Sequence, residues 1–457
     1  MKIFSSRRGK TTKVSAVTKK GLKKWMASQP LQTSNWIKKV GFDGTSGSTC
    51  LVPGEDGSLE QVLVGVSDSL KIWDTGGLAG GLPEGIYSFV GFNDKGTATL
   101  ATLGWALGAY RFDRYKKPVP LKTFLQWPES CDRKHVERTV EATFLVRDLI
   151  NTPAEDMGPS ELEKITRSLA KKHYAKFRVI RGKQLLSQNY PAIHAIGRAS
   201  DDAPRLIDVI WGKTTHPKVT LVGKGVCFDT GGLDIKPASG MKFMKKDMGG
   251  AAHVLGVASM LISAKAQVRL RVLIPAVENN IAGNSIRPLD VVRTRNGKTI
   301  EIGHTDAEGR VILADALSEA AREKPGLIID FATLTGAARV ALGADLPALF
   351  TNDDALAELM LKSGKAVQDP LWRLPLWSGY RSQIEGKTAD LTNSADTGFG
   401  GAITAALFLQ EFVEPATCWA HVDLMAWNST ARPGRPEGGE AMGLRAVYQS
   451  ILDWIGQ

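Results

Sequence analysis

The chain has 457 residues, of which 43% are hydrophobic and 23% charged, an ordinary composition for a globular protein of two or three domains. No run of 18 or more apolar residues occurs, so the sequence predicts no membrane-spanning helix. The net charge of +11 points to a polyanionic partner, yet the first 40 residues hold 11 basic residues and no acidic one. The rest of the chain has 47 basic and 47 acidic residues, so the excess of positive charge is confined to the N-terminal segment.

The basic N-terminal segment, residues 1–40, has three interpretations. An acid-free stretch that holds Ser and Arg is typical of a transit peptide. The same charges suit an arm that attracts polyanions such as nucleic acid. The third interpretation is an ordinary first strand and helix with a lysine-rich solvent face, and the helical spacing of apolar residues in 21–27 favours it. No apolar segment of the secretory type follows the charges, so secretion is disfavoured.

The first 130 residues predict a small α/β domain. Strands are expected at 50–53, 61–66 and 85–90, and a helix at 97–110. Apolar residues then recur at helical spacing up to an Asn-Thr-Pro sequence, so residues 131–152 are expected to be a helix that connects two domains.

Residues 153–457 alternate short apolar runs with helical patterns. Strands are expected at 218–222, 268–276, 327–331, 348–351 and 419–423, and helices at 247–263, 311–323 and 402–413. This alternation predicts an α/β/α domain with a mixed, largely parallel central sheet. Ligands of such sheets bind in loops beyond the carboxyl ends of the strands.

Four cysteines are scattered through the chain without any Cys-x-x-Cys pair: Cys50, Cys131, Cys227 and Cys418. The spacing argues against a structural zinc site and a disulfide framework, and it fits a reducing, cytoplasmic location. Cys227 is expected to be a small buried hydrophobe rather than a nucleophile.

Two glycine-rich stretches stand beside these strands. They read Val222-Gly-Lys-Gly-Val-Cys-Phe-Asp-Thr-Gly-Gly232 and His304-Thr-Asp-Ala-Glu-Gly-Arg310. With their surroundings they supply four carboxylates and three basic groups: Asp229, Asp247, Asp306, Glu308, Lys224, Lys236 and Arg310. Carboxylates are costly to bury without a compensating cation or hydrogen bonds, and such a cluster is what a two-metal hydrolytic site requires.

Structural explanations exist for parts of this pattern. Thr305 and Glu308 have the spacing of a capping box, and Asp247 has the place of a helix N-cap. Lys224 lies between glycines, but the chain has no complete phosphate-loop motif. Caps leave the other charged residues of the two stretches unexplained.

At these residues the chain resembles the leucyl aminopeptidase family, also called cytosol aminopeptidases, which are dinuclear-metal exopeptidases. Six of the seven positions of the family motif Asn-Thr-Asp-Ala-Glu-Gly-Arg match, and His304 replaces the asparagine. Sequences at 147–154, 247–251, 332–337 and 389–393 also resemble the family, in the family's order, so the resemblance covers about residues 145–457.

The resemblance implies a role for each site residue. Lys224, Asp229, Asp247 and Glu308 would hold the tighter metal; Asp229, Asp306 and Glu308 would hold the more exchangeable one, with the Asp306 carbonyl as a further ligand. Lys236 would stabilise the oxyanion, and Arg310 would hold a bicarbonate ion that acts as general base. His304 is expected not to bind metal directly, and His253 and His421 are expected to be packed core residues.

The resemblance also implies substrate and assembly. Met244, Thr333 and Gly336, with the Leu334 backbone, would form a small apolar P1 pocket for Leu-like or Met-like N-terminal residues. Two divalent ions per subunit are expected, Mn²⁺ or Zn²⁺ foremost and Mg²⁺ as a further candidate, in a homo-hexamer that cleaves peptides with a free N-terminus. The competing hypothesis is a DNA-binding regulatory or architectural protein, and the basic N-terminal segment alone supports it.

Overall fold

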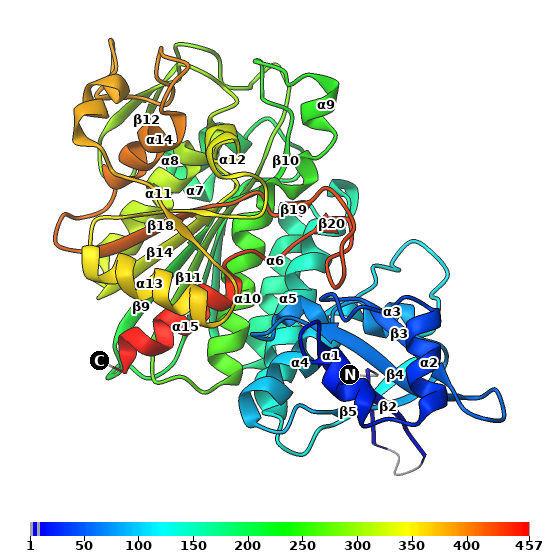
Figure 1. Ribbon diagram of the computed structural model, residues 1–457. Helices are drawn as coiled ribbons and strands as arrows, with labels where there is room; N and C mark the ends of the chain where they lie inside the picture. Colours follow the sequence, from blue (N-terminus) through cyan, green and yellow to red (C-terminus); the bar gives the residue numbers. More distant parts are fainter. Residues whose placement is uncertain (1–2, 7–9, 457) are drawn as a thin grey trace. The chain divides into compact units, whose positions relative to one another are not determined.

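The computed structural model describes residues 3–6 and 10–456 (Figure 1). The chain divides into two compact units. The N-terminal unit comprises the chain up to Phe144 together with Ser429–Glu437, and the larger unit comprises Leu145–Asn428 with Gly438–Gln457. Helix α5 (Arg133–Asn151) carries the chain from the first unit into the second.

The N-terminal unit is built on a six-stranded sheet in the order β1-β6-β5-β2-β4-β3, in which only the β3–β4 pair is antiparallel. Its elements are β1 (Phe4–Ser5), β2 (Thr12–Thr18), α1 (Leu22–Ala27), α2 (Leu31–Lys39), β3 (Thr49–Pro53), β4 (Leu59–Val66), η1 (Ile72–Asp74), α3 (Leu78–Gly81), β5 (Gly85–Val90), α4 (Lys95–Gly108) and β6 (Thr123–Gln126). The three predicted strands are confirmed as β3, β4 and β5, and the predicted helix as α4.

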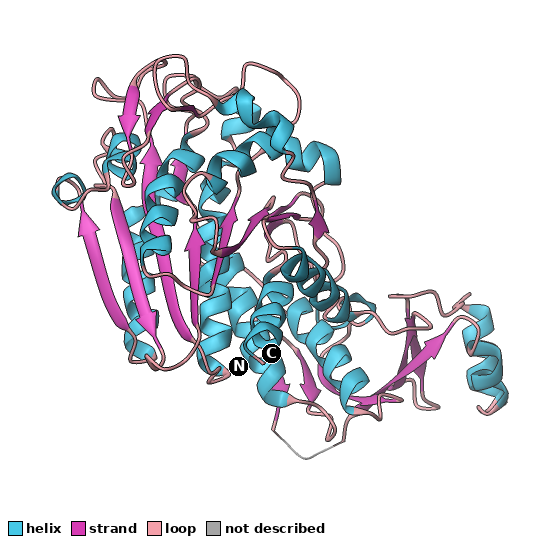
Figure 2. Ribbon diagram, turned by 90° about the vertical axis from the view of Figure 1, so that its left-hand side faces the viewer, coloured by secondary structure: helices cyan, strands magenta, loops and turns pink. Residues whose placement is uncertain are grey.

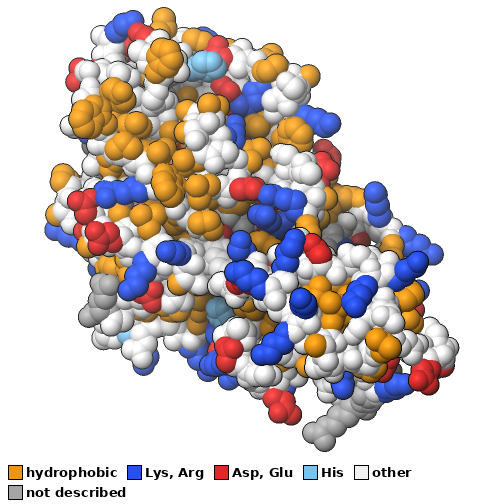
Figure 3. All heavy atoms as spheres, viewed as in Figure 1, with side chains coloured by type: hydrophobic (Ala, Val, Ile, Leu, Met, Phe, Trp, Pro, Cys, Tyr) orange, Lys and Arg blue, Asp and Glu red, His pale blue; other side chains and the backbone are white. Residues whose placement is uncertain are grey.

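The basic N-terminal segment is part of this fold. Strand β2 pairs with β4 on one side and β5 on the other, and α1 and α2 follow it. The strand-and-helix interpretation is therefore confirmed for residues 12–39, and a removable transit peptide over that range is wrong because it would remove a central strand. Lys2, Arg7 and Arg8 lie outside the described residues. Figure 3 shows the basic side chains of this unit interspersed with acidic and apolar ones.

The larger unit contains a nine-stranded sheet in the order β16-β15-β18-β14-β9-β11-β8-β7, with β10 paired to β11 off this path. The elements that precede α11 are η2 (Ala154–Asp156), α6 (Pro159–Lys172), β7 (Lys176–Arg181), α7 (Gln184–Ser187), α8 (Pro191–Gly197), β8 (Arg205–Trp211), β9 (Lys218–Gly223), β10 (Gly225–Asp229), α9 (Ala238–Met241), η3 (Met244–Met248), α10 (Gly249–Ser263), β11 (Arg269–Asn279), β12 (Val291–Arg293) and β13 (Thr299–Glu301). The others are α11 (Glu308–Arg322), β14 (Leu327–Ala332), α12 (Gly336–Leu342), β15 (Ala348–Thr351), α13 (Asp354–Ala366), β16 (Trp372–Arg373), η4 (Ser378–Ile384), β17 (Leu391–Thr392), α14 (Gly401–Gln410), β18 (Cys418–Asp423), β19 (Trp427–Asn428), β20 (Gly438–Gly439) and α15 (Leu444–Ile455).

Helices cover both faces of this sheet (Figure 2). Helices α8, α11 and α14 share one apolar core with the sheet, while α6, α10, α13 and α15 pack on the opposite face. Every residue of the central strand β14 is buried, as expected for a parallel strand that is covered on both sides. The predicted mixed, largely parallel α/β/α fold is confirmed. Among the helices of the described residues, none combines the length and the apolarity needed to cross a membrane.

Two histidines of the larger unit are core residues, as predicted. His421 is fully buried, and its Nδ1 lies 2.5 Å from Asp330 Oδ1. His253, on α10, is also fully buried; its Nδ1 contacts the Gly249 carbonyl at 2.6 Å and its Nε2 accepts a hydrogen bond from the Met442 backbone at 2.9 Å. Because Nε2 accepts, the ring of His253 is neutral with its proton on Nδ1.

The buried His253 predicts an acid-sensitive contribution to stability. Burial lowers the pKa of His253 to about 4, whereas an exposed histidine titrates near 6.5. The neutral, buried His253 therefore contributes its full stabilisation above pH ~6.5. As the pH falls from 6.5 toward 4, the free energy of unfolding decreases by about 3 kcal/mol, because the unfolded chain binds the proton more readily. Thermal unfolding of the wild type and of His253→Gln across pH 4–7 tests this. The wild type should lose more stability than the variant, and parallel pH curves would contradict the assignment.

Candidate active site

The first site residues lie where β9 and β10 meet. The chain leaves β9 at Gly223, and the Lys224 backbone N–H donates to the Phe331 carbonyl at 3.0 Å. A Cβ at Gly223 would lie 2.6 Å from Val254, so a side chain is excluded there. Strand β10 then ends at Asp229, at the carboxyl edge of the sheet where ligands of such folds bind.

Asp229 is held in place by two hydrogen bonds. Its Oδ1 accepts from the Gly231 backbone at 2.9 Å and from Asn279 Nδ2 at 2.8 Å. Its Oδ2 lies 2.8 Å from Lys236 Nζ, and Lys236 also pairs with Asp306. Asn279 was not predicted from the sequence; it ends β11, and only the pairing of β10 with β11 brings it beside Asp229.

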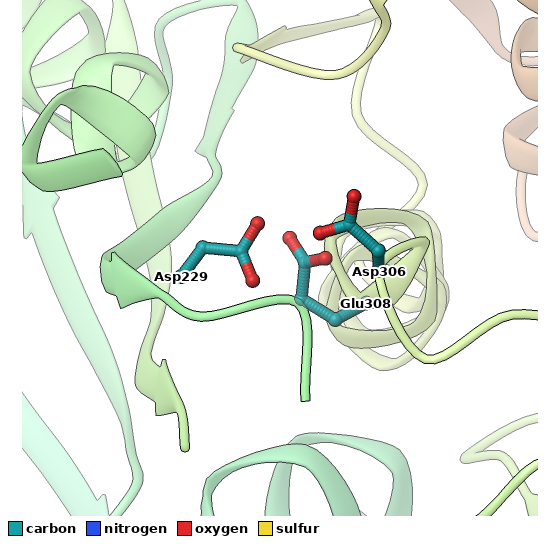
Figure 4. Close-up of side chains that lie close together, drawn as sticks. All are labelled: Asp229, Asp306 and Glu308. Atoms are coloured by element: carbon teal, nitrogen blue, oxygen red, sulfur yellow. The ribbon is translucent and has the colours of Figure 1, made fainter. Parts of the chain in front are cut away.

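Three carboxylates converge at this edge. Figure 4 shows that Asp229, from the end of β10, points toward Asp306, in the loop before α11, and Glu308, the first residue of α11. One oxygen of each lies within 4.8 Å of the others. The capping-box interpretation of Thr305 is wrong, because the Thr305 hydroxyl donates to the Gly231 carbonyl and accepts from the Asp234 backbone instead of capping α11.

A fourth carboxylate, Asp247, joins the cluster through Lys224. Lys224 Nζ lies 2.7 Å from Asp247 Oδ2 and 2.9 Å from Glu308 Oε1. The N-cap interpretation of Asp247 is wrong, because Met248 precedes α10 and the Asp247 Oδ1 accepts from the Thr333 hydroxyl at 2.7 Å. A Cβ at Gly309 would lie 2.4 Å from Lys224 Cε, which explains the glycine after Glu308.

The charges of the cluster fit a bound cation. If all groups are ionised, four carboxylates face the two ammonium groups of Lys224 and Lys236. Glu308 is 1% exposed and its Oε2 has no hydrogen-bond partner. Burial, reinforced by the charge of Asp229, raises the pKa of Glu308 well above its usual range and that of Asp306 to about 6. Glu308 and Asp306 are thus poorly neutralised in this arrangement, and a divalent cation bound beside them would compensate their charge.

Lys224 carries a proton in this arrangement. Burial by itself would lower the pKa of Lys224, but the charges of Asp247, Glu308 and Asp229 outweigh burial and raise it. Lys224 is therefore an ammonium group surrounded by carboxylates. A metal ion bound to those carboxylates would compete with this ammonium group for them.

His304 lies beside the cluster but outside the group of converging oxygens. Its side chain is 50% exposed, and its Nδ1 accepts a hydrogen bond from the Asp306 backbone at 3.1 Å. The side chain of Asn393 braces the His304 backbone through two hydrogen bonds. In this geometry His304 positions the loop that carries Asp306.

His304→Asn should therefore keep most of the activity, because an asparagine oxygen can also accept from the Asp306 backbone. We expect kcat/KM within about twofold of the wild type, the usual effect of an exposed substitution. Peptidase kinetics and metal content measured on the same preparation test this. An inactive, metal-poor variant would make His304 a ligand.

Cys227 behaves as predicted. It is buried within β10, and burial raises the pKa of its thiol well above the usual range. A thiol held protonated in this way is a poor nucleophile.

A cavity of about 400 Å³ opens at the cluster. Ten of the eleven predicted site residues line it, namely Lys224, Asp229, Lys236, Met244, Asp247, Asp306, Arg310, Thr333, Leu334 and Gly336. The eleventh, Glu308, is buried and is not among the residues that line the cavity. Arg310 is largely buried, and burial lowers its pKa to about 10. Five lining residues were not predicted: Lys246, Thr335, Ala337, Arg339 and Gly401. Two of the five, Lys246 and Arg339, are basic, so the cavity as a whole is not lined by small and apolar residues alone.

A parallel α/β sheet with a carboxylate-rich cavity at its carboxyl edge is typical of metal-dependent hydrolases. Comparison with known families identifies the class. The model of the cytosol aminopeptidase family, catalytic domain, matches residues 144–448, and that of the M17 aminopeptidase N-terminal domain matches residues 13–128. The chain belongs to the cytosol aminopeptidase family.

Individual relatives agree with this assignment. A probable cytosol aminopeptidase of Roseiflexus castenholzii is 39% identical over 78% of this chain and 76% of its own length. Peptidase B of Pectobacterium atrosepticum is 39% identical over 78% of this chain and 84% of its own length.

Solved structures are similar over nearly the whole chain. The cytosol aminopeptidase of Coxiella burnetii has a TM-score of 0.95 and 51% identity over 98% of both chains. The bottromycin maturation enzyme BotP in complex with Mn has a TM-score of 0.87 and 31% identity over 97% of this chain and 99% of its own. The protein is thus a peptidase of the metal-dependent aminopeptidase class.

Proposed function

We propose that the protein removes N-terminal residues from peptides by a two-metal mechanism. Two observations carry the proposal. Asp229, Asp306 and Glu308 bring carboxylate oxygens close together, and the buried Oε2 of Glu308 has no hydrogen-bond partner. Lys224, Asp229, Asp247 and Glu308 would hold one ion; Asp229, Asp306 with its backbone carbonyl, and Glu308 would hold the other. Oxygen donors without histidine suit Mn²⁺ and Mg²⁺ as well as Zn²⁺, and the related BotP structure contains Mn.

Lys224 has a conditional role in this proposal. An ammonium group has no lone pair to offer, so Lys224 must lose its proton before it can act as a ligand. Because the charges of three carboxylates hold that proton, cations bound to the same carboxylates would favour its release.

Metal ions bound at these residues would activate water, polarise the scissile carbonyl and anchor the free α-amine of the substrate. Lys236 donates to the oxyanion that forms as the carbonyl is attacked. Arg310 would hold a bicarbonate ion, which would supply the general base; the buried Nε of Arg310 has no hydrogen-bond partner, which supports an anion partner. Met244, Thr333 and Gly336, with the Leu334 backbone, receive the P1 side chain, and Leu-like and Met-like residues fit the apolar part.

Family membership also supports a homo-hexamer and a cytoplasmic location as parts of this proposal. The hypothesis of a DNA-binding protein gains nothing from the structure, because the described part of the basic segment is folded and two of its lysines pair with acids. Lys19 pairs with Asp43 and Lys20 with Asp68.

The test compares leucyl amide with its N-acetylated form. Metal-loaded protein should cleave leucyl amide and leave the acetylated compound intact, because acetylation removes the amine that the site would anchor. Exhaustive chelation should abolish cleavage, and Mn²⁺ should restore it. Efficient cleavage of the acetylated amide would contradict an aminopeptidase.

A further inference from the structure

One buried side chain joins the two glycine-rich stretches that carry the proposed metal ligands. Asn279 ends β11 and is 3% exposed. Its Nδ2 donates to Asp229 Oδ1 at 2.8 Å and to the Thr305 carbonyl at 3.1 Å. Asp229 belongs to the first stretch, and Thr305 precedes Asp306 in the second. A single amide group therefore contacts a proposed ligand of both ions and the backbone of the loop that carries a further ligand.

The main chain of Asn279 has a separate structural role. Its carbonyl accepts from the Thr230 backbone at 3.1 Å and from the Thr230 hydroxyl at 2.8 Å, and its backbone pairs with that of Asp229 between β10 and β11. A residue of another type could supply these backbone contacts as well. The side-chain contacts, in contrast, need an NH₂ group, because both of their partners accept hydrogen bonds.

The surroundings of the amide group hold it in one place. A Cβ built on Gly232 would lie 3.1 Å from Asn279 Oδ1 and 3.0 Å from the Thr305 hydroxyl, so the backbone of the first stretch packs closely against both residues. The Thr305 hydroxyl in turn donates to the Gly231 carbonyl at 2.6 Å. Asn279 and Thr305 are both buried, and their contact is therefore shielded from competing solvent.

The contact with Asn279 also gives the two oxygens of Asp229 different surroundings. Oδ1 accepts from Asn279 and from the Gly231 backbone, whereas Oδ2 lies 2.8 Å from the Lys236 ammonium group. Neutral donors thus hold Oδ1, and Oδ2 faces positive charge. An uncharged amide orients the carboxylate in this way without adding a cation that would repel a metal ion.

We propose that Asn279 is a positioning residue that couples the two metal-binding stretches and thereby sets the affinity of the site for its ions. Without the amide, Asp229 loses one of its two neutral donors and the loop of Asp306 loses its link to β11. Groups that orient metal ligands typically account for about 10- to 100-fold in metal affinity. Because Thr305 adjoins Asp306, the more exchangeable ion should depend on Asn279 more strongly than the tighter ion. This inference rests on the proposed two-metal function.

The test measures Mn²⁺ binding to metal-free protein by isothermal titration calorimetry. Asn279→Leu keeps a side chain branched at Cγ and removes the donor, so the second ion should bind about 10- to 100-fold more weakly than in the wild type, with a smaller loss for the first. Raising the Mn²⁺ concentration should restore most of kcat for leucyl amide, because the reacting groups remain in place. Asn279→Ala, which adds no bulk at the site, should show the same two results.

The matched control is Thr230→Val, which removes a hydroxyl from the Asn279 carbonyl and leaves the contacts of the amide group unchanged. It should lower the unfolding temperature of the metal-free protein and keep the Mn²⁺ affinity of the wild type. Equal weakening of Mn²⁺ binding in Thr230→Val would overturn the inference, because the backbone of the turn would then be responsible.

Two further results would overturn the inference alone. One is a wild-type Mn²⁺ affinity in both Asn279 variants, and the other is a loss of kcat that excess Mn²⁺ does not restore. Failure of the wild type itself to bind two ions would overturn the proposed function, and the inference with it.

Discussion

Glu308→Gln should lower kcat/KM by more than the 10²–10³-fold loss that removal of a single oxyanion donor causes, so that almost no peptidase activity remains. Glu308 is the most enclosed carboxylate of the cluster; it is 1% exposed and contacts Lys224 from the first turn of α11. In the proposal it serves both metal ions, so the neutral glutamine should lower the occupancy of both. Metal-free Glu308→Gln should unfold at a temperature at least as high as the metal-free wild type, because a poorly neutralised buried acid has been removed.

The measurement pairs elemental analysis with thermal unfolding. The matched control is Glu319→Gln, a buried glutamate on the same helix that pairs with Arg271 and Arg295 outside the cluster. The control should lose stability and keep its metal content, whereas Glu308→Gln should do the opposite. A Glu308→Gln protein with full metal content and normal turnover would contradict the assignment.

Lys236→Met should lower kcat by about 10²–10³-fold while the protein keeps its metal ions. Lys236 contacts Asp229 and Asp306 from the side of the cavity, and in the proposal it donates to the oxyanion. Removing it takes no ligand away from either metal ion.

The comparison variant is Lys224→Met. Lys224 is a proposed ligand that lies between Asp247 and Glu308, so its replacement should reduce metal content directly. Steady-state kinetics and metal analysis of the two variants under identical conditions separate the roles. Equal metal loss in both would show that the two lysines do not differ in function.

The sequence predicted strands whose apolar runs are long and whose partners lie on both sides, such as β9, β14 and β18. It missed β10 as a strand, because five residues that begin with glycine and pair only with β11 resemble a loop. Helix α11 begins at Glu308, three residues before the predicted start, since Glu-Gly-Arg lacks the apolar periodicity on which the prediction relied.

Residues that line the cavity were predicted where motif sequences carried them and missed where only the fold brings them together. Asn279 reaches Asp229 from the end of another strand, and Arg339 lines the same cavity from α12. Lys246 is another residue of the cavity that the sequence did not predict. Lys245 is half-buried against the Asn151 carbonyl and its neighbour Lys246 is buried in the cavity wall, and no sequence motif distinguishes the two lysines.

The central claim is that two divalent ions at the Asp229–Asp306–Glu308 cluster are required for activity. The most direct test strips the protein of metal, adds Mn²⁺ back in steps, and records bound metal per chain together with hydrolysis of aminoacyl amides. The account predicts no activity in the metal-free protein, saturation at two ions per chain, and full turnover only when both are bound. Full turnover in protein confirmed to be free of metal, or saturation at a single ion, would contradict it.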